Sequence, residues 1–551
     1  MSAGQRRLAT IVLGAWMVLG HAPAFAEALT AEQWRQDLNA FVDQAPKVHK
    51  NLLHALTREQ FEAAIQRLND RIPSLSRNQI IVELARIVAR IGDGHSYLSL
   101  LEPPISFRRY PIKLYEFPDG VYVVSADPKY KAVVGGRVIE IGGSSFEQVY
   151  RALGDIVPRD NAMQVKWLAP NYATIAEVLD GLGLADDAES LALTVLKNGK
   201  RVKVQLIPQT PRQAHYHAWD TEAGWADARA PEAPVPLWLQ SSDDAYWFKY
   251  LPEEKILYVQ YNQVQNKTDE TVEGFFERVM TFADRNPVER FVLDVRLNGG
   301  GNNYLNRPII HGFIRSDKIN QPGRLFTIIG RQTFSAAMNF VNAMKLNTHT
   351  LFVGEPTGAR PNSYGDNAPV ILPNSKIPVR LSTLWWQDMD PRDTRDYQGP
   401  DLAADLTMAD YQAGRDPALE VIKKYDPRGS PSEMVRAAIL HHDLAAAKKA
   451  VLAQKGNPLY RYTTVERQVN SLGYELLGKK SFDEAIEVFK LNIETYPDSW
   501  NAYDSLAEAY AARHDVAKDD LRLAGQNYQK SLQLNPQNSR ARGALERLKQ
   551  H

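Results

Sequence analysis

The stretch FVLDVRLNGGGNN, residues 291–303, decides the fold, because a run of apolar strand-forming residues leads directly into three glycines. Glycine has no side chain, so backbone N–H groups in such a turn can come close to a ligand atom. An oxyanion hole can be built in this way. Taken alone, however, the stretch fits a tight turn after a core strand better. The segments around it are needed to decide between the two.

The next informative segment places a serine at the expected start of a helix. Residues 325–330 read LFTIIG, which is a strand pattern, and a short loop leads to a helical stretch that opens with Ser335. The N–H groups and the dipole at a helix N-terminus favour developing negative charge, as the site of a nucleophile requires. Serine is also a good helix N-cap, and on this segment alone the N-cap is the better explanation.

Four motifs in a fixed order carry more information than any one of them: GDGHSYL (92–98), LDVRLNGGG (293–301), TFSAA (333–337) and VGEPTG (353–358). Together they resemble the tail-specific, or C-terminal processing, serine peptidases, a family that includes the tricorn protease core and the interphotoreceptor retinoid-binding protein. The likeness covers about residues 91–401. It implies a peptide or protein substrate, Ser335 as the nucleophile, and Gly299, Gly300 and the N–H of Ala336 as oxyanion donors.

The general base cannot be the lysine of the bacterial processing branch of this family, because Arg360 occupies its place. Arginine stays protonated in proteins and cannot accept the serine proton. Lys345 is ten residues further along the expected helix, which puts it about 15 Å from Ser335. The tricorn-like branch uses a histidine before its PDZ-like segment, and His95 stands at that place. A neutral imidazole can accept the Ser335 proton and later return it to the leaving amine.

A histidine base usually has an orienting partner on its other ring nitrogen. In the tricorn-like branch a glutamate close before a G-x-x-P-D ending contributes to this. The corresponding ending here is RDYQGPD, residues 395–401, which is shorter and has no glutamate. We therefore expect Asp396 to orient His95, with Asp393 and Ser96 as the alternatives.

The chain should fold into several domains, because 551 residues are too many for one core. The pattern along the chain predicts an α/β (α+β) fold. Helical spacing gives way to short glycine-bounded strands, then to alternating strands and helices, and finally to a helical region. We assign a signal peptide to 1–26, an N-terminal helical region to 27–100, a domain that resembles PDZ domains to 105–210, a peptidase core with a mixed β-sheet to 211–410, and helical repeats that resemble tetratricopeptide repeats to 420–551.

An internal repeat supports the last of these assignments. Ala485 and Pro497 are matched by Ala524 and Pro536 further along the chain. The spacing is somewhat longer than the period of about 34 residues of tetratricopeptide repeats, which fits a loop insertion. A plain helical bundle is the alternative, since only two units are clear. Repeats of this type would bind a protein partner on a concave helical face.

Composition excludes several classes of function. Lys plus Arg and Asp plus Glu both number 65, so the chain has no basic excess for binding nucleic acid. The absence of cysteine excludes disulfides and thiolate chemistry. Residues 1–26 combine a charged start, an apolar run and an A-F-A site, which is typical of an export signal. No later stretch is long and apolar enough to span a membrane.

The leading hypothesis is therefore an exported, periplasmic or secreted serine endopeptidase that needs no metal or cofactor. The alternative is a catalytically inactive binding or scaffold protein on the same fold, which would use its PDZ-like and repeat modules. The absent lysine and the absent glutamate favour this alternative.

Overall fold

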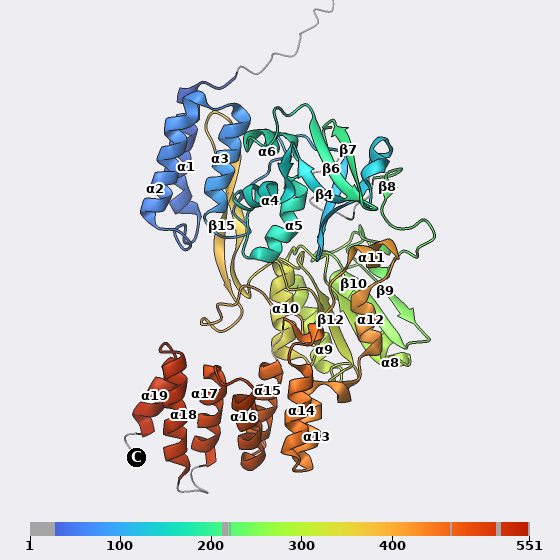
Figure 1. The fold of residues 1–551 in the computed structure, drawn as a ribbon, viewed down its shortest axis with the longest axis vertical. Coiled ribbons are helices and arrows are strands. Elements are labelled where there is room, and N and C mark those ends of the chain that lie inside the picture. The colour runs from blue at the N-terminus through green and yellow to red at the C-terminus, as the bar shows by residue number, and fades with distance from the viewer. Residues whose placement is uncertain (1–27, 212–218, 220–221, 463–464, 514–518, 549–551) are drawn as a thin grey trace, which may run out of the picture.

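Figure 1 shows the computed structural model of the chain, which describes residues 28–211, 219, 222–462, 465–513 and 519–548. The predicted signal peptide, 1–26, lies outside these residues. The described chain has a mixed α/β fold, as the sequence predicts, with three sheets, a group of helices at the start and a row of helices at the end. No helix in this part of the chain has both the length and the apolar character needed to cross a bilayer.

Three helices form the beginning of the described chain: α1 (Ala31–Val48), α2 (Arg58–Arg71) and α3 (Arg77–Ala89), with the short 3-10 helix η1 (Ile72–Ser74) between the last two. Each of the three begins with a capping box, in which a Thr or Ser side chain and a Gln side chain bond the free N–H groups of the first turn. The helices lie beside a long hairpin, β14 (Asn362–Ile371) and β15 (Pro378–Gln387), that comes from the later part of the chain (Figure 1). The first helices and the hairpin thus form one packed unit.

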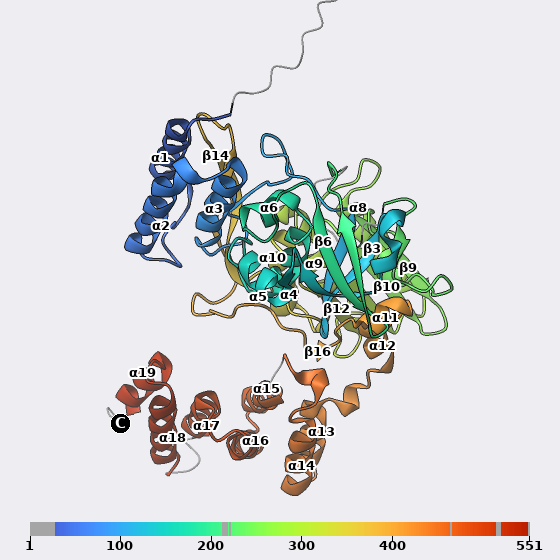
Figure 2. The same ribbon diagram turned by 45° about the horizontal axis from the view of Figure 1, so that its top comes forward.

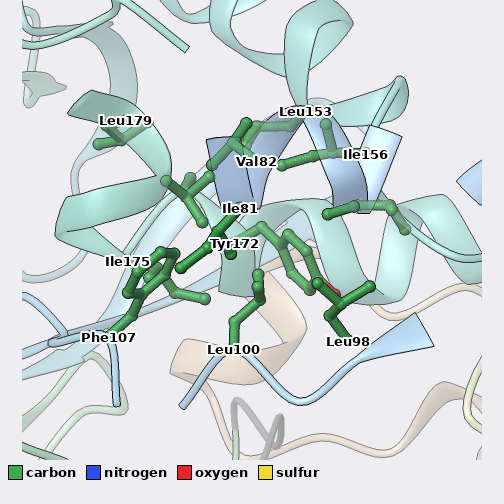
Figure 3. Packing of buried hydrophobic residues seen from close by; sticks show 14 of the residues in the cluster. Ile81, Val82, Leu98, Leu100, Phe107, Leu153, Ile156, Tyr172, Ile175 and Leu179 are labelled. Atoms are coloured by element: carbon green, nitrogen blue, oxygen red, sulfur yellow. The ribbon is translucent and has the colours of Figure 1, made fainter. Parts of the chain in front are cut away.

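The hairpin also holds the segment that contains His95. Strand β1 (Tyr97–Leu98) pairs with β15, with Tyr97 opposite Arg380, so the sheet order is β1-β15-β14. Behind β1 a hydrophobic cluster joins α3 to the helices of the next region. Figure 3 shows Ile81 and Val82 of α3 in one cluster with Leu98 and Leu100, and the last two are almost fully buried. Strand β15 and the hydrophobic cluster behind β1 therefore hold the segment that contains His95 in place.

The second region is an antiparallel sheet with helices packed on it (Figures 1 and 2). Its strand order is β2-β3-β4-β6-β7, and Asn198 and Gly199 form the turn between β6 and β7, where both have positive φ as a type I′ turn requires. The resemblance to a PDZ domain stays a prediction. The elements are β2 (Ile112–Phe117), β3 (Gly120–Ala126), η2 (Pro128–Val133), β4 (Arg137–Ile141), β5 (Ser144–Ser145), α4 (Phe146–Gly154), α5 (Ala162–Tyr172), α6 (Ala176–Gly181), β6 (Leu191–Lys197), β7 (Lys200–Leu206) and β8 (Ala226–Asp227).

The core of the molecule is a six-stranded sheet of order β16-β13-β12-β11-β10-β9, parallel except for β9. Every residue of β10 and β12 is buried, as expected for parallel strands covered on both faces. The elements are α7 (Leu237–Gln240), β9 (Tyr246–Leu251), β10 (Ile256–Tyr261), α8 (Val272–Arg285), β11 (Arg290–Asp294), η3 (Asn303–Asn306), α9 (Arg307–Arg315), β12 (Leu325–Ile329), α10 (Ala336–Asn347), β13 (Leu351–Gly354), β16 (Leu402–Ala403), α11 (Met408–Gln412) and α12 (Pro417–Lys424).

Alternate residues of these strands enter two different hydrophobic clusters. Leu257 and Val259 of β10 pack with the helices α8, α9 and α10, whereas Ile256 and Tyr258 pack with α12 and the helices that follow it. Strands β11 and β12 are neighbours and run in the same direction, so the loops after them meet at one edge of the sheet. This edge receives the three glycines after β11 and the serine after β12, and it is where α/β folds bind their ligands.

The end of the chain is a row of paired helices, visible in both Figures 1 and 2. The helical character of this region is confirmed, but its relation to tetratricopeptide repeats stays a prediction. Ala485 and Ala524 are fully buried, and a Cβ on Gly473 would lie 2.4 Å from the Phe489 ring, so small residues let the helices approach closely. The elements are η4 (Pro427–Gly429), α13 (Pro431–Leu440), α14 (Leu444–Gln454), η5 (Pro458–Tyr460), α15 (Val465–Gly478), α16 (Phe482–Thr495), α17 (Trp500–Arg513), α18 (Asp520–Leu534) and α19 (Ser539–Leu548).

Candidate active site

The structure brings His95 and Ser335 into direct contact. The Nε2 atom of His95 lies 2.9 Å from the Oγ atom of Ser335, although the two residues are 240 positions apart. His95 comes from the loop between α3 and β1, and Ser335 stands immediately before α10. This distance is that of a hydrogen bond, and it is within reach for a direct proton transfer between a nucleophile and its base.

Ser335 has a backbone conformation that few residues other than glycine adopt. Its φ is 52° and its ψ is −129°. A non-glycine residue in such a region costs about 1–3 kcal/mol, and this kind of strain is concentrated at functional sites. The Ser335 side chain forms no N-cap hydrogen bond with α10. The N-cap explanation of this serine is therefore wrong, because the hydroxyl is directed at His95 instead of at the helix.

The environment of His95 keeps its imidazole neutral. The residue is only 8% exposed, and its ring stacks on Phe334 with 4.4 Å between the ring centres. Burial lowers the pKa of His95, and the charges of Asp93 and Asp366 and the backbone of Tyr364 offset this only in part. With Nε2 accepting from the serine hydroxyl, the ring proton is on Nδ1. A neutral ring of this tautomer is the form that can take a proton from Ser335.

Two N–H groups beside Ser335 are open to a developing oxyanion. Among the described residues, none accepts a hydrogen bond from the N–H of Gly299 or of Ala336. Ala336 is the first residue of α10, where the helix leaves its N–H groups without internal partners. These two predicted donors thus remain available at the edge of the sheet.

The prediction that Gly300 donates to an oxyanion has to be corrected. Its N–H donates to the Oδ1 atom of Asn298 at 2.9 Å and is therefore already occupied. The glycine is required for another reason: its φ is +108°, and a Cβ at this position would lie 2.7 Å from the Cβ of Ser335. Gly300 makes room for the Ser335 side chain, and its N–H is not free for a further acceptor.

Sequence reasoning missed Asn298, which organises this turn. The residue is fully buried, and its Nδ2 donates to the carbonyl of Tyr261 at 2.9 Å. The backbone carbonyl of Asn298 accepts a hydrogen bond from the N–H of Phe334 at 3.1 Å. Asn298 therefore connects the glycine turn to the loop that carries Ser335. The available signal was an asparagine between a buried strand and three glycines, where a side-chain amide can replace missing backbone partners.

The predicted orienting residue, Asp396, is not brought to His95. Its carboxylate forms an ion pair with Arg360 at 2.9 Å, and its side chain is 63% exposed. Its carbonyl accepts from Asn161 Nδ2 at 2.7 Å. The alternative Asp393 pairs with Arg395 at 2.6 Å. The Nδ1 atom of His95 is buried and forms no hydrogen bond with any described side chain. Because Asp396 is paired with Arg360 and Asp393 with Arg395, residues 393–396 supply no partner for the His95 imidazole.

The two cations considered for the role of base are engaged elsewhere. Arg360 donates from Nε to the carbonyl of Asp160 at 2.8 Å, in addition to its pair with Asp396. Burial lowers the pKa of Lys345 to about 8, but its Nζ donates to Gln398 at 2.7 Å. Within the described ranges there is no group of three or more side chains suited to binding a metal ion.

Comparison with known proteins places this geometry on a known fold. No protein-family model matches the sequence, and no curated protein does. Among solved structures, mature CPAF complexed with lactacystin is 14% identical, with a TM-score of 0.52 over 72% of this chain and 98% of that one. The chain has the fold of CPAF. A second structure of mature CPAF gives 13% identity and a TM-score of 0.51 over 76% of this chain and 99% of that one. The photosystem II D1 C-terminal processing protease is matched at 14% identity over 71% of this chain and 99% of that one, with a TM-score of 0.34.

The match with CPAF covers 98% of the CPAF chain but only 72% of this chain. The shared unit is therefore complete here, and further structure is added to it. At 14% identity the likeness concerns the path of the backbone, and the chemistry has to be argued from the side chains of this chain.

Proposed function

We propose that the protein is a serine peptidase that hydrolyses peptide bonds through an acyl-enzyme on Ser335. The single observation that carries the proposal is the 2.9 Å contact between Ser335 Oγ and His95 Nε2. The strained φ of Ser335 and the open N–H groups of Gly299 and Ala336 support it, because an acyl-transfer site needs an exposed nucleophile and oxyanion donors.

The reaction would follow the usual course of serine acyl transfer. Ser335 Oγ attacks the carbonyl carbon while its proton moves to His95 Nε2, and the carbonyl oxygen becomes an oxyanion next to Gly299 and Ala336. The intermediate collapses, the C–N bond breaks, and the leaving amine takes the proton from His95. A water molecule then gives a proton to His95 and attacks the acyl carbon. The bond between this carbon and Ser335 Oγ breaks, His95 returns the proton to Oγ, and the acid is released with Ser335 restored.

The finer features of the hypothesis are part of the same proposal. The chain is exported to the periplasm or secreted, which the pattern of residues 1–26 supports. It acts on internal peptide bonds, and its antiparallel sheet region presents a peptide by strand addition. The C-terminal helices bind a protein partner or substrate. Fractionation of cells that produce the full chain tests the location, since mature chain in the cytoplasmic fraction would contradict export.

Covalent labelling tests the proposed nucleophile without knowledge of the substrate. A fluorophosphonate reacts with an activated serine by forming an O–P bond and releasing fluoride, whereas an ordinary surface serine does not react. The wild-type chain should be labelled once, and Ser335→Ala should not be labelled. Ser471→Ala, at an exposed position of α15, is the matched control and should be labelled like the wild type. A wild-type chain that resists labelling and cleaves no peptide would favour the inactive scaffold instead.

A further inference from the structure

A buried carboxylate lies two residues before His95 and is bonded on several sides. Asp93 is 1% exposed. It accepts hydrogen bonds from the backbone N–H of His95 at 3.0 Å, from His49 Nε2 at 3.0 Å and from Ser382 Oγ at 2.5 Å. His49 follows α1 and Ser382 belongs to β15, so Asp93 connects the first helix, the histidine loop and the hairpin. None of these three residues was selected from the sequence.

The direction of each hydrogen bond in this group can be assigned. The N–H of Asn51 donates to Nδ1 of His49 at 2.9 Å, so His49 carries its proton on Nε2 and donates it to Asp93. The N–H of Ser382 donates to Ser96 Oγ, whose hydroxyl is 3.5 Å from Ser382 Oγ. This leaves the Ser382 hydroxyl free to donate to Asp93. All the groups around Asp93 are therefore donors, as an ionised carboxylate requires.

Asp93 remains ionised for this reason, despite its burial. Burial raises the pKa of Asp93, but the hydrogen bonds from His49 and Ser382 bring it below the ordinary value. The result is a fixed negative charge in the interior, two residues before His95 in the same loop. The same charge raises the pKa of His95 more than any other neighbouring group does.

The proposed reaction needs such a charge at this place. When His95 takes the Ser335 proton it becomes a buried cation, and an uncompensated buried cation is costly. Its Nδ1 atom has no side-chain partner among the described residues, the backbone of Tyr364 is a neutral group, and Asp396 is paired with Arg360. We propose that Asp93 is the positioning carboxylate of this site: it holds the His95 backbone, and its negative charge stabilises the imidazolium during proton transfer. This inference rests on the proposed peptidase function.

Other charged groups around His95 are less suited to this role. Asp366 of β14 is exposed to solvent, which screens its charge. Asp160 accepts the N–H of Gly94 at 2.8 Å, but burial, with Asp93 nearby, raises its pKa to about 7, so it is not fully ionised at neutral pH. Arg360 bonds Asp160 through its backbone N–H and is paired with Asp396. Asp93 is thus the neighbour of His95 that is both buried and ionised.

The experiment measures the rate of fluorophosphonate labelling of the full chain against pH. Asp93→Asn should lower the labelling rate by about 100-fold, within the range usual for groups that assist proton transfer. It should also move the acid limb of the profile to lower pH, because loss of a negative charge lowers the pKa of His95 further. Asp366→Asn is the matched control, and its rate should change by less than about threefold.

The outcomes separate this inference from the proposed function. A wild-type chain that is not labelled contradicts the peptidase itself. A labelled wild type with an Asp93→Asn variant of equal rate, or of lower rate with an unmoved acid limb, overturns only the role of Asp93. Should this variant fail to fold, Ser382→Ala decides. Loss of the Ser382 donor raises the pKa of Asp93. Protonation of Asp93 should then make the acid limb of the rate profile steeper than in the wild type. A profile identical to that of the wild type would overturn the inference.

Discussion

The two ring nitrogens of His95 lie in contrasting surroundings. On the Nε2 side, Ser335, the glycine turn and the start of α10 are held by adjacent strands of one sheet, and the contact is a normal hydrogen bond. On the Nδ1 side no described side chain forms a hydrogen bond, and the charges of Asp93 and Asp366, followed by the backbone of Tyr364, raise the pKa of His95. The comparison teaches that the fold positions the Ser335–His95 contact through one sheet, whereas the charge next to His95 comes from a different part of the chain.

Removing the imidazole tests the Nε2 side most strongly. His95→Ala should lower peptide hydrolysis by about 10³- to 10⁴-fold, as loss of the base does in serine hydrolases. The measurement is the initial rate of hydrolysis of a labelled protein substrate, with thermal unfolding as the check on folding. A His311→Ala variant, on α9, is the control and should keep the wild-type rate. Equal rates for His95→Ala and the wild type would remove His95 from the mechanism.

Substitution of Gly299 and Gly300, which lie next to each other in the glycine turn, tests the Nε2 side in more detail. Gly300→Ala should reduce the hydrolysis rate by at least about 100-fold and the free energy of unfolding by about 1–3 kcal/mol, because its Cβ would meet Ser335 and its φ is positive. Gly299→Ala keeps the N–H group and places its Cβ in open space, so its rate should fall by less than about tenfold. Similar losses in both variants would contradict the different roles of the two glycines.

The pH dependence of the wild type depends on both sides of the ring. Because burial lowers the pKa of His95 in the folded chain, the imidazole stays neutral below its ordinary value of about 6.5. The rate of hydrolysis should therefore hold at pH 6.5 and decline only as the pH falls further, when His95 becomes protonated and can no longer accept a proton. A profile of kcat/KM against pH gives this acid limb. An acid limb above pH 7 would show that His95 is not desolvated in the working enzyme.

The smallest effect is expected for the residue first selected for the Nδ1 side. Asp396→Asn removes an exposed ion pair with Arg360, so it should change the free energy of unfolding by less than about 1 kcal/mol. Hydrolysis should stay within about twofold of the wild type, because the carboxylate does not reach His95. Chemical denaturation and initial rates measure the two effects. A loss above tenfold would return Asp396 to the site and would imply that the segment 395–398 moves during the reaction.

The part of the site that depends on the sheet could be predicted from the sequence. Ser335 and the glycine turn follow adjacent strands, so motif order and strand direction together indicate that they meet. His95 was found by resemblance, and the structure brings it to the serine. The partner of Nδ1 could not be found in this way, because ion pairs such as that of Asp396 with Arg360 depend on side-chain reach across loops. Asp93 escaped notice because its partners, His49 and Ser382, are far from it in sequence.

The turn of the hairpin is bonded to the first helix, since the N–H of Asn374 donates to Asp37 at 2.6 Å across 337 positions of sequence. Contacts between such distant positions form late, after the intervening chain has been made and folded. The Asp93 network lies in this same packed unit. The proposed active site would therefore not be assembled in a nascent chain until synthesis had passed the hairpin.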